Sequence, residues 1–269
     1  MPEPSNERWT FVAASSPLDG APWSVRILPF QGDQARYDSF RHGEGDFSGS
    51  HSGYPSVNRD KAYTPNGDFQ CPSHERSTSS VPNTDYFGVS GGGQTGTMPA
   101  GKKPSDGYFW FTVNNAHYFD NGTIVINGSV RPKDVTDGTS KQFLLGESRF
   151  QLQLCSEEAA AAAVPGTWWV GRISRPSWAG SARNSPSGFT LGSTALAAIN
   201  SINGSLWGDV CSYPSPTVDI WREQLRYFGS RHPGGCHMAY ADGSVRFTEQ
   251  TIDIAAFRRL GSRADGQAQ

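Results

Sequence analysis

The stretch SRHPGGCHMAYADGSVRF, residues 230–247, carries the clearest structural signal in this chain. From His237 to Phe247 it consists of two short alternating segments on either side of Asp242-Gly243. An Asp-Gly pair between such segments is a strong hairpin signal, because a type I′ turn needs a positive φ at both central residues. We therefore predict two antiparallel strands joined by a type I′ turn.

The rest of the chain contains signals for short helices and further strands. Asp253 is placed to cap a helix that continues through Leu260 and stops at Gly261. Short helices are also predicted over residues 33–40 and from Ser156 to a stop at Pro165. Composition rich in β-branched and aromatic residues favours strands in GYFWFTV (107–113), TIVINGSV (123–130), QFLLGESRFQLQL (142–154) and TWWVGRI (167–173). The chain thus favours strands with irregular connections over long helices.

The composition limits the domain organisation. The chain has 269 residues, of which 31 are Gly and 18 are Pro, so many turns are expected. We predict a single globular domain over residues 1–269, with residues 1–20 disordered. Residues 41–106, rich in Gly, Ser, Pro, Asn and His, are expected to form a loop-rich insertion with short strands, in which DFQCPS (68–73) and TDYFGVSGGG (84–93) are the best candidates for ordered structure. A disordered linker over residues 41–66 is the alternative.

Charge and hydropathy limit the partners. The net charge is −2 and no basic patch stands out, which argues against nucleic-acid binding. No stretch reaches the roughly 18 apolar residues that a membrane-spanning helix needs. Residues 1–20 lack the basic and apolar regions of a signal peptide. As written, the chain is expected to be soluble.

Motifs along most of residues 21–260 resemble, in order, those of one bacterial family. They are APWSVRILPFQGDQARYDSF (21–40), FQCPSH (69–74), NTDYFGVSGG (83–92), DVTDGTSKQFLLGES (134–148) and the nine-residue spacing between His232 and Asp242-Gly243. Together they resemble the prepilin-type processing-associated H-X9-DG family (DUF1559), which is abundant in planctomycetes. In this family His232, Asp242 and Gly243 correspond to the signature itself.

The resemblance implies a pilin-like α+β head with an antiparallel sheet, short helices and long ordered loops. It implies a non-enzymatic structural or interaction protein of the cell surface, in a pilus-like or type II secretion-like assembly. The partners would be other pilin-like subunits, as a homo- or hetero-oligomer. Members of the family typically begin with a prepilin signal and a long apolar helix, and the sequence from Met1 shows neither. Attachment to the membrane is therefore expected only through such a missing N-terminal helix, with the head on the outer face.

The signature residues allow two interpretations. In the first, the hairpin brings His232 and Asp242 together across their nine-residue spacing, so that the histidine and the carboxylate serve as a base or as support for a metal ligand. A hydrolase using this pair is the least favoured of our hypotheses, because no nucleophile stands at a recognisable spacing. We favour the structural interpretation, in which His232 satisfies backbone groups and Asp242 makes the turn.

The sequence contains no standard metal-binding motif, but some residues are candidate ligands. Asp134, Asp137 and Glu147 supply oxygen ligands around a Gly-containing turn, so they are candidates for a Ca²⁺ site, although EF-hand spacing is absent. No other cofactor is expected. The histidines are scattered, so a zinc site would require residues distant in the sequence to converge; they are His42, His51, His74, His117, His232 and His237.

Cysteines and tryptophans leave alternatives open. The four cysteines are dispersed, which suits either two disulfides or buried thiols, and Cys211–Cys236 is the disulfide that we favour. Exposed tryptophans would suit an extracellular carbohydrate-binding module, which is our alternative function, whereas strand spacing favours a role in the core. The set comprises Trp110, Trp168, Trp169, Trp178, Trp207 and Trp221.

Overall fold

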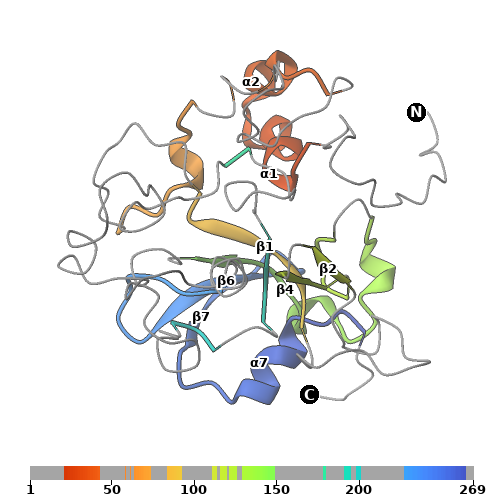
Figure 1. Ribbon diagram of the computed structural model, residues 1–269, viewed down its shortest axis with the longest axis vertical. Coiled ribbons are helices and arrows are strands. Elements are labelled where there is room, and N and C mark those ends of the chain that lie inside the picture. The colour runs from red at the N-terminus through yellow and green to blue at the C-terminus, as the bar shows by residue number, and fades with distance from the viewer. Residues whose placement is uncertain are drawn as a thin grey trace.

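A five-stranded sheet organises the fold, which we describe from a computed structural model (Figure 1). The structure describes residues 21–42, 58, 61, 64–73, 84–92, 111–113, 116–119, 121–125, 129–148, 178–179, 191–194, 198–200 and 227–264. In the sheet, the strands lie in the order β5-β1-β4-β6-β7. Their bounds are β1 (Tyr86–Gly91), β4 (Phe143–Glu147), β5 (Leu191–Ser193), β6 (Gly235–Tyr240) and β7 (Val245–Glu249).

The strand pairing is antiparallel from β1 through β4 and β6 to β7. Only β5 joins β1 in parallel. A second, two-stranded sheet is formed by β2 (Phe111–Val113) and β3 (Ala116–Tyr118). The predicted α+β class with a mainly antiparallel sheet is therefore confirmed.

The helices are short, as predicted. Near the N-terminus lie α1 (Trp23–Arg26), η1 (Leu28–Gln31) and α2 (Gln34–Ser39), followed by the single turn η2 (Gly67–Phe69). Further turns are η4 (Pro132–Asp134) and η5 (Thr139–Lys141), and α7 (Ile254–Leu260) follows the hairpin. Among the described residues, no helix combines the length and the apolar character that crossing a bilayer requires.

The C-terminal hairpin is confirmed, but its turn is not of type I′. Gly243 has φ 85°, whereas Asp242 does not have a positive φ. The N–H of Gly243 donates to the Tyr240 carbonyl at 2.9 Å, and the N–H of Tyr240 donates to the Ser244 carbonyl at 2.8 Å. These bonds enclose a three-residue loop with a left-handed glycine at its end, which is the type I turn with a G1 bulge. Only the second residue of the Asp-Gly pair needed the left-handed conformation.

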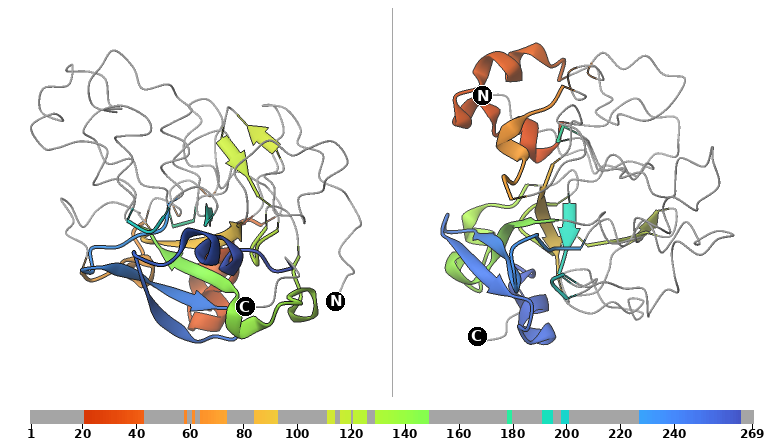
Figure 2. Two further views of the ribbon diagram at one scale, coloured as in Figure 1. Left: turned by 90° about the horizontal axis from the view of Figure 1, so that it is seen from below. Right: turned by 90° about the vertical axis from the view of Figure 1, so that its left-hand side faces the viewer.

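Helix α7 begins and ends as predicted and covers one face of the sheet (Figure 2). The Asp253 carboxylate accepts the N–H of Ala256 at 2.9 Å, and Gly261 is the C-cap. Phe257 is fully buried and packs with Phe143 and Phe228 in the sheet's core. The core cluster consists of Phe87, Val89, Phe143, Ile199, Phe228, Cys236, Met238, Tyr240 and Phe257.

A second hydrophobic cluster holds the N-terminal helices, which lie beyond one end of the sheet (Figure 2). Val25 and Leu28 are fully buried there, together with the stacked rings of Phe69 and Trp178, whose centroids are 5.4 Å apart. Trp178 donates its Nε1–H to the Thr64 carbonyl at 2.7 Å. Trp178 is therefore a core residue, as predicted for the tryptophans.

One predicted strand needs correction. In residues 123–130, the described part bends: the N–H groups of Thr123 and Ile124 both donate to the Val89 carbonyl, so the chain crosses the end of β1 instead of forming a ladder. Within residues 41–106, a short strand was expected, and β1 forms inside the ordered candidate 84–93 as a central strand of the sheet. The predictions for residues 1–20, the helix from Ser156 and the strand 167–173 lie outside the described residues.

Candidate functional site

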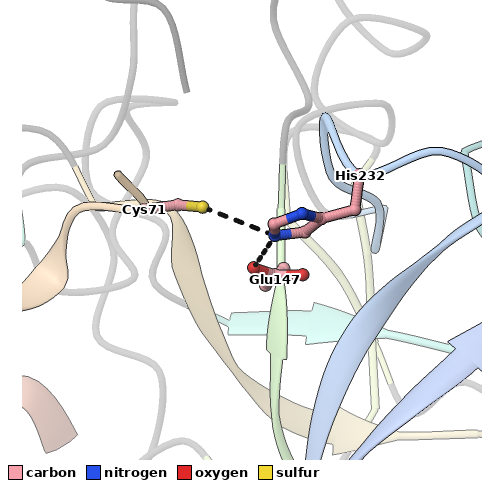
Figure 3. A group of neighbouring side chains, drawn as sticks. All are labelled: Cys71, Glu147 and His232. Atoms are coloured by element: carbon pink, nitrogen blue, oxygen red, sulfur yellow. Dashed lines mark hydrogen bonds and ion pairs between the residues drawn. The ribbon is translucent and has the colours of Figure 1, made fainter. Parts of the chain in front are cut away.

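Three chemically reactive side chains from distant parts of the chain meet beside the sheet: Cys71, Glu147 and His232 (Figure 3). Their ligating atoms all lie within 4.8 Å of one another. Within the described part of the chain, they are the only group of three or more Cys, His, Asp or Glu side chains that close together.

Glu147 is the centre of the site. It is the last residue of β4, and its side chain is only 5% exposed. Its Oε2 accepts the backbone N–H of His237 at 2.6 Å and lies 3.3 Å from that residue's Nδ1. Its Oε1 lies 3.2 Å from His232 Nε2. One carboxylate oxygen is thus fixed by β6, and the other faces the convergence point.

His232 is presented by the loop that leads into β6. Its backbone N–H donates to Ser230 Oγ at 3.0 Å, and the same hydroxyl donates to the Gly235 carbonyl at 2.7 Å. This short serine turn aims the imidazole back towards Glu147. The side chain is 26% exposed, so the site is reached from solvent on this side.

Cys71 comes from the segment that joins the N-terminal helical cluster to the sheet. It follows η2, and its backbone N–H donates to the buried Asp85 carboxylate at 2.8 Å. Asp85 in turn donates its own N–H to the Phe69 carbonyl at 2.8 Å. These two bonds anchor the Cys71 backbone, and its Sγ lies 3.7 Å from His232 Nε2.

The thiols near the site are held in the protonated form. Burial raises the pKa of Cys71 and outweighs the lowering by a backbone hydrogen bond from Ser73, and the nearby Glu147 and Asp85 carboxylates raise the pKa further. Burial also raises the pKa of Cys236, with a further contribution from Glu147. Without a bound cation, neither thiol is therefore activated as a thiolate nucleophile.

The structure places the signature residues His232 and Asp242 at opposite ends of β6, so they do not form a pair. Asp242 Oδ1 accepts from the N–H and the hydroxyl of Ser244, at 2.9 and 2.7 Å. These bonds lower the pKa of Asp242. Asp242 therefore makes the turn, and Gly243 supplies its left-handed residue.

The proposed calcium ligands do not converge on one ion. Asp134 is bound by its neighbour Arg131, whose Nε lies 3.1 Å from Oδ2, and this contact lowers the pKa of Asp134. Asp137 lies in the turn after η4, where its Oδ1 accepts from the Thr136 hydroxyl at 3.5 Å. Glu147 belongs to the site with Cys71 and His232.

Of the remaining candidate cysteines and tryptophans, the structure describes only some, and those are buried. Cys236 is buried with its Sγ 3.7 Å from the sulfur of Met238, and its predicted partner Cys211 lies outside the described residues, so that disulfide stays a prediction. Of the tryptophan set, only Trp178 is described, and it is fully buried.

Sequence reasoning missed the grouping of Cys71 with Glu147 and His232. The signal that pointed to it was the set of motifs: FQCPSH contains Cys71, FLLGES contains Glu147, and the H-X9-DG spacing begins at His232. Each motif supplies one side chain, but only the strand order brings them together.

The comparisons with known proteins show the family. Residues 2–255 match the family described as "Protein of unknown function (DUF1559)", and the chain belongs to this family. No curated protein and no solved structure matched the chain.

Proposed function

We propose that this protein is a non-enzymatic structural or interaction protein: the pilin-like head of a subunit that is displayed at the cell envelope. Its partners would be other pilin-like subunits in a pilus-like or type II secretion-like assembly. The family resemblance of the sequence motifs motivates this role. The observation that carries it is the outer strand β7.

Strand β7 presents apolar side chains to solvent on the outer edge of the described sheet. Val245 is 65% exposed and Phe247 is 44% exposed. Both alternate with Arg246 and Thr248, so they project from the same face of the sheet. An outer strand with exposed apolar side chains is a template for pairing with another chain, and soluble proteins usually protect such edges. We infer that a second pilin-like subunit covers this strand.

The candidate site supports a structural role more than a catalytic one. In a nucleophilic relay, the histidine uses one nitrogen towards the nucleophile and the other towards the carboxylate. Here the Cys71 sulfur and the Glu147 oxygen both approach Nε2 of His232 (Figure 3). The raised pKa of Cys71 also opposes nucleophilic attack.

The test is to locate the protein and its contacts in its host. Envelope and cytoplasmic fractions would be separated, the protein detected with an antibody, and its neighbours captured by cross-linking in whole cells. We expect it in the envelope, cross-linked to pilin-like subunits. Recovery in the cytoplasm, without such cross-links, would refute the proposal.

Two variants separate the β7 contact from general effects. Phe247→Lys places a charge within the proposed contact and is expected to abolish the cross-links. Glu249→Lys changes charge on the same strand without removing an apolar side chain, and should retain them. Circular dichroism would show that both variants fold. Equal cross-linking by both would rule out β7 as the contact.

A further inference from the structure

We propose that Cys71, Glu147 and His232 bind one Zn²⁺ ion, which ties three distant segments of the chain together. The inference starts from the chemistry of the ligands. A cysteine sulfur, an imidazole nitrogen and a carboxylate oxygen are the donors that zinc takes in proteins. All three side chains offer these atoms to one point.

The distances fit a tetrahedral ion. With Zn–S of about 2.3 Å and Zn–N and Zn–O of about 2.0–2.1 Å, tetrahedral angles place S and N about 3.6 Å apart and N and O about 3.3 Å apart. The structure has 3.7 Å between Cys71 Sγ and His232 Nε2, and 3.2 Å between that nitrogen and Glu147 Oε1. These two distances match two edges of one zinc tetrahedron, and the sulfur and the carboxylate oxygen also lie within 4.8 Å of each other.

Without an ion, the three groups are linked by hydrogen bonds: Nε2 of His232 approaches both Cys71 Sγ and Glu147 Oε1, and the Cys71 thiol also hydrogen-bonds to Glu147. A bound Zn²⁺ would take the place of the thiol proton, because the thiolate is the form of cysteine that ligates metals. Thiolate, carboxylate and Zn²⁺ also sum to zero charge, which suits a site where Glu147 and Cys71 are almost completely buried.

Hydrogen bonds from neighbouring groups hold all three proposed zinc ligands in place. Metal-binding residues are usually oriented by outer hydrogen bonds. The N–H of His237 holds Glu147 Oε2, Asp85 holds the backbone of Cys71, and Ser230 holds the backbone of His232. The fourth position of the tetrahedron is left to water on the side where His232 is exposed.

The role that follows is mechanical. Cys71 belongs to the segment that follows the N-terminal helical cluster, Glu147 to the middle of the sheet, and His232 to the loop before the hairpin. A single ion would fasten these three parts at one point. This inference is independent of the proposed contact at β7, which lies on other residues.

The test uses the full chain, purified under non-chelating reductant, stripped with a chelator and titrated with Zn²⁺ alone by calorimetry. We expect one equivalent to bind per chain. Co²⁺ in place of Zn²⁺ should give a thiolate-to-cobalt charge-transfer band. Absence of zinc binding by the folded, stripped protein would overturn the proposal.

Variants identify the ligands. His232→Asn and Cys71→Ser should each weaken zinc binding by more than about 100-fold, which exceeds the usual loss from an outer-shell partner. His42→Asn, an exposed histidine, and Cys236→Ala, the other described cysteine, are the controls and should bind as the parent does. The cobalt band should vanish in Cys71→Ser and persist in Cys236→Ala. Unchanged binding in both ligand variants would refute the site, and circular dichroism would establish that each is folded.

Discussion

Replacing Gly92 by alanine tests how α7 docks on the sheet. Gly92 follows β1, and a Cβ on it would lie 1.9 Å from the carbonyl oxygen of Arg258 and 2.6 Å from Thr194 Oγ1. An ordinary carbon–oxygen contact is about 3.3 Å, so the last turn of α7 would have to retreat by about 1.4 Å. The obstacle is backbone, which cannot turn aside as a flexible side chain does.

The retreat would loosen Phe257, which that helix inserts into the core. Overpacking costs about 1–3 kcal/mol, and a backbone obstacle places this substitution near the upper end, at about 3 kcal/mol. For a chain of this size, that corresponds to a melting temperature lower by roughly 6–12 °C.

The assay is urea and thermal unfolding followed by circular dichroism, with Gly67→Ala as the matched control. A Cβ on Gly67 meets nothing within 4 Å, and its φ is not in the left-handed region. The control should stay within about 0.5 kcal/mol of the parent. If Gly92→Ala is as stable as Gly67→Ala, the close approach of α7 to the end of β1 is wrong.

Other predictions concern α7 and the hairpin turn. Phe257→Ala should lower the free energy of unfolding by about 3–5 kcal/mol in urea titrations, whereas Ile254→Ala, at an exposed position of the same helix, should cost far less. Asp253→Ala removes the helix cap and should cost about 1 kcal/mol by the same measurement. The lowered pKa of Asp242, due to Ser244, means that its stabilising effect is present above the unfolded pKa of about 3.9 and is lost as the pH falls through the folded pKa. Asp242→Asn should therefore flatten the acid limb of the melting temperature against pH, and an unchanged acid limb would contradict this role.

Local signals predicted the C-terminal part of the fold well. The hairpin and α7 depend on neighbouring residues: alternation along β6 and β7, the cap at Asp253 and the stop at Gly261. The reason why a glycine ends this helix lies in tertiary packing, which the sequence does not reveal. Gly261 has φ −88°, and a Cβ there would lie 2.0 Å from Thr194 Oγ1. The glycine is required by close packing and not by a left-handed conformation.

Non-local pairing explains the failures. Composition predicted a strand over residues 123–130, but a strand needs a partner edge, and the edge of β1 is taken by β4 and β5. Conversely, the short strand expected within residues 84–93 is β1, but its Gly-rich composition did not indicate a place at the centre of the sheet. The glycines at its end serve the close approach of Asn121 and α7 to that strand. Composition cannot distinguish a glycine that bends the chain from one that admits a neighbour.

The candidate site was beyond sequence reasoning for the same reason. In the sequence, the whole of β1 and the two-stranded sheet lie between Cys71 and Glu147, and a further long segment separates Glu147 from His232. Nothing local in any of the three motifs shows that β4 lies between β1 and β6, and this strand order alone places them at one point. The motif set indicated that these residues mattered, without indicating that they meet.

The spacing of the H-X9-DG signature has a physical explanation in β6. Its histidine stands just before the strand at the candidate site, and its Asp-Gly pair turns the chain at the other end, so the nine intervening residues include the whole strand. Because side chains alternate along a strand, this length sets which ones face the core. Cys236, Met238 and Tyr240 point inwards, while His237 between them meets Glu147. A shift of the strand by one residue would turn the core side chains of β6 towards the other face of the sheet. It would also move the His237 N–H away from the Glu147 carboxylate that it now holds. The nine-residue spacing therefore fixes the register of β6 between the hairpin turn and the candidate site. This explains why His232 and Asp242 belong to one motif although their side chains do not touch.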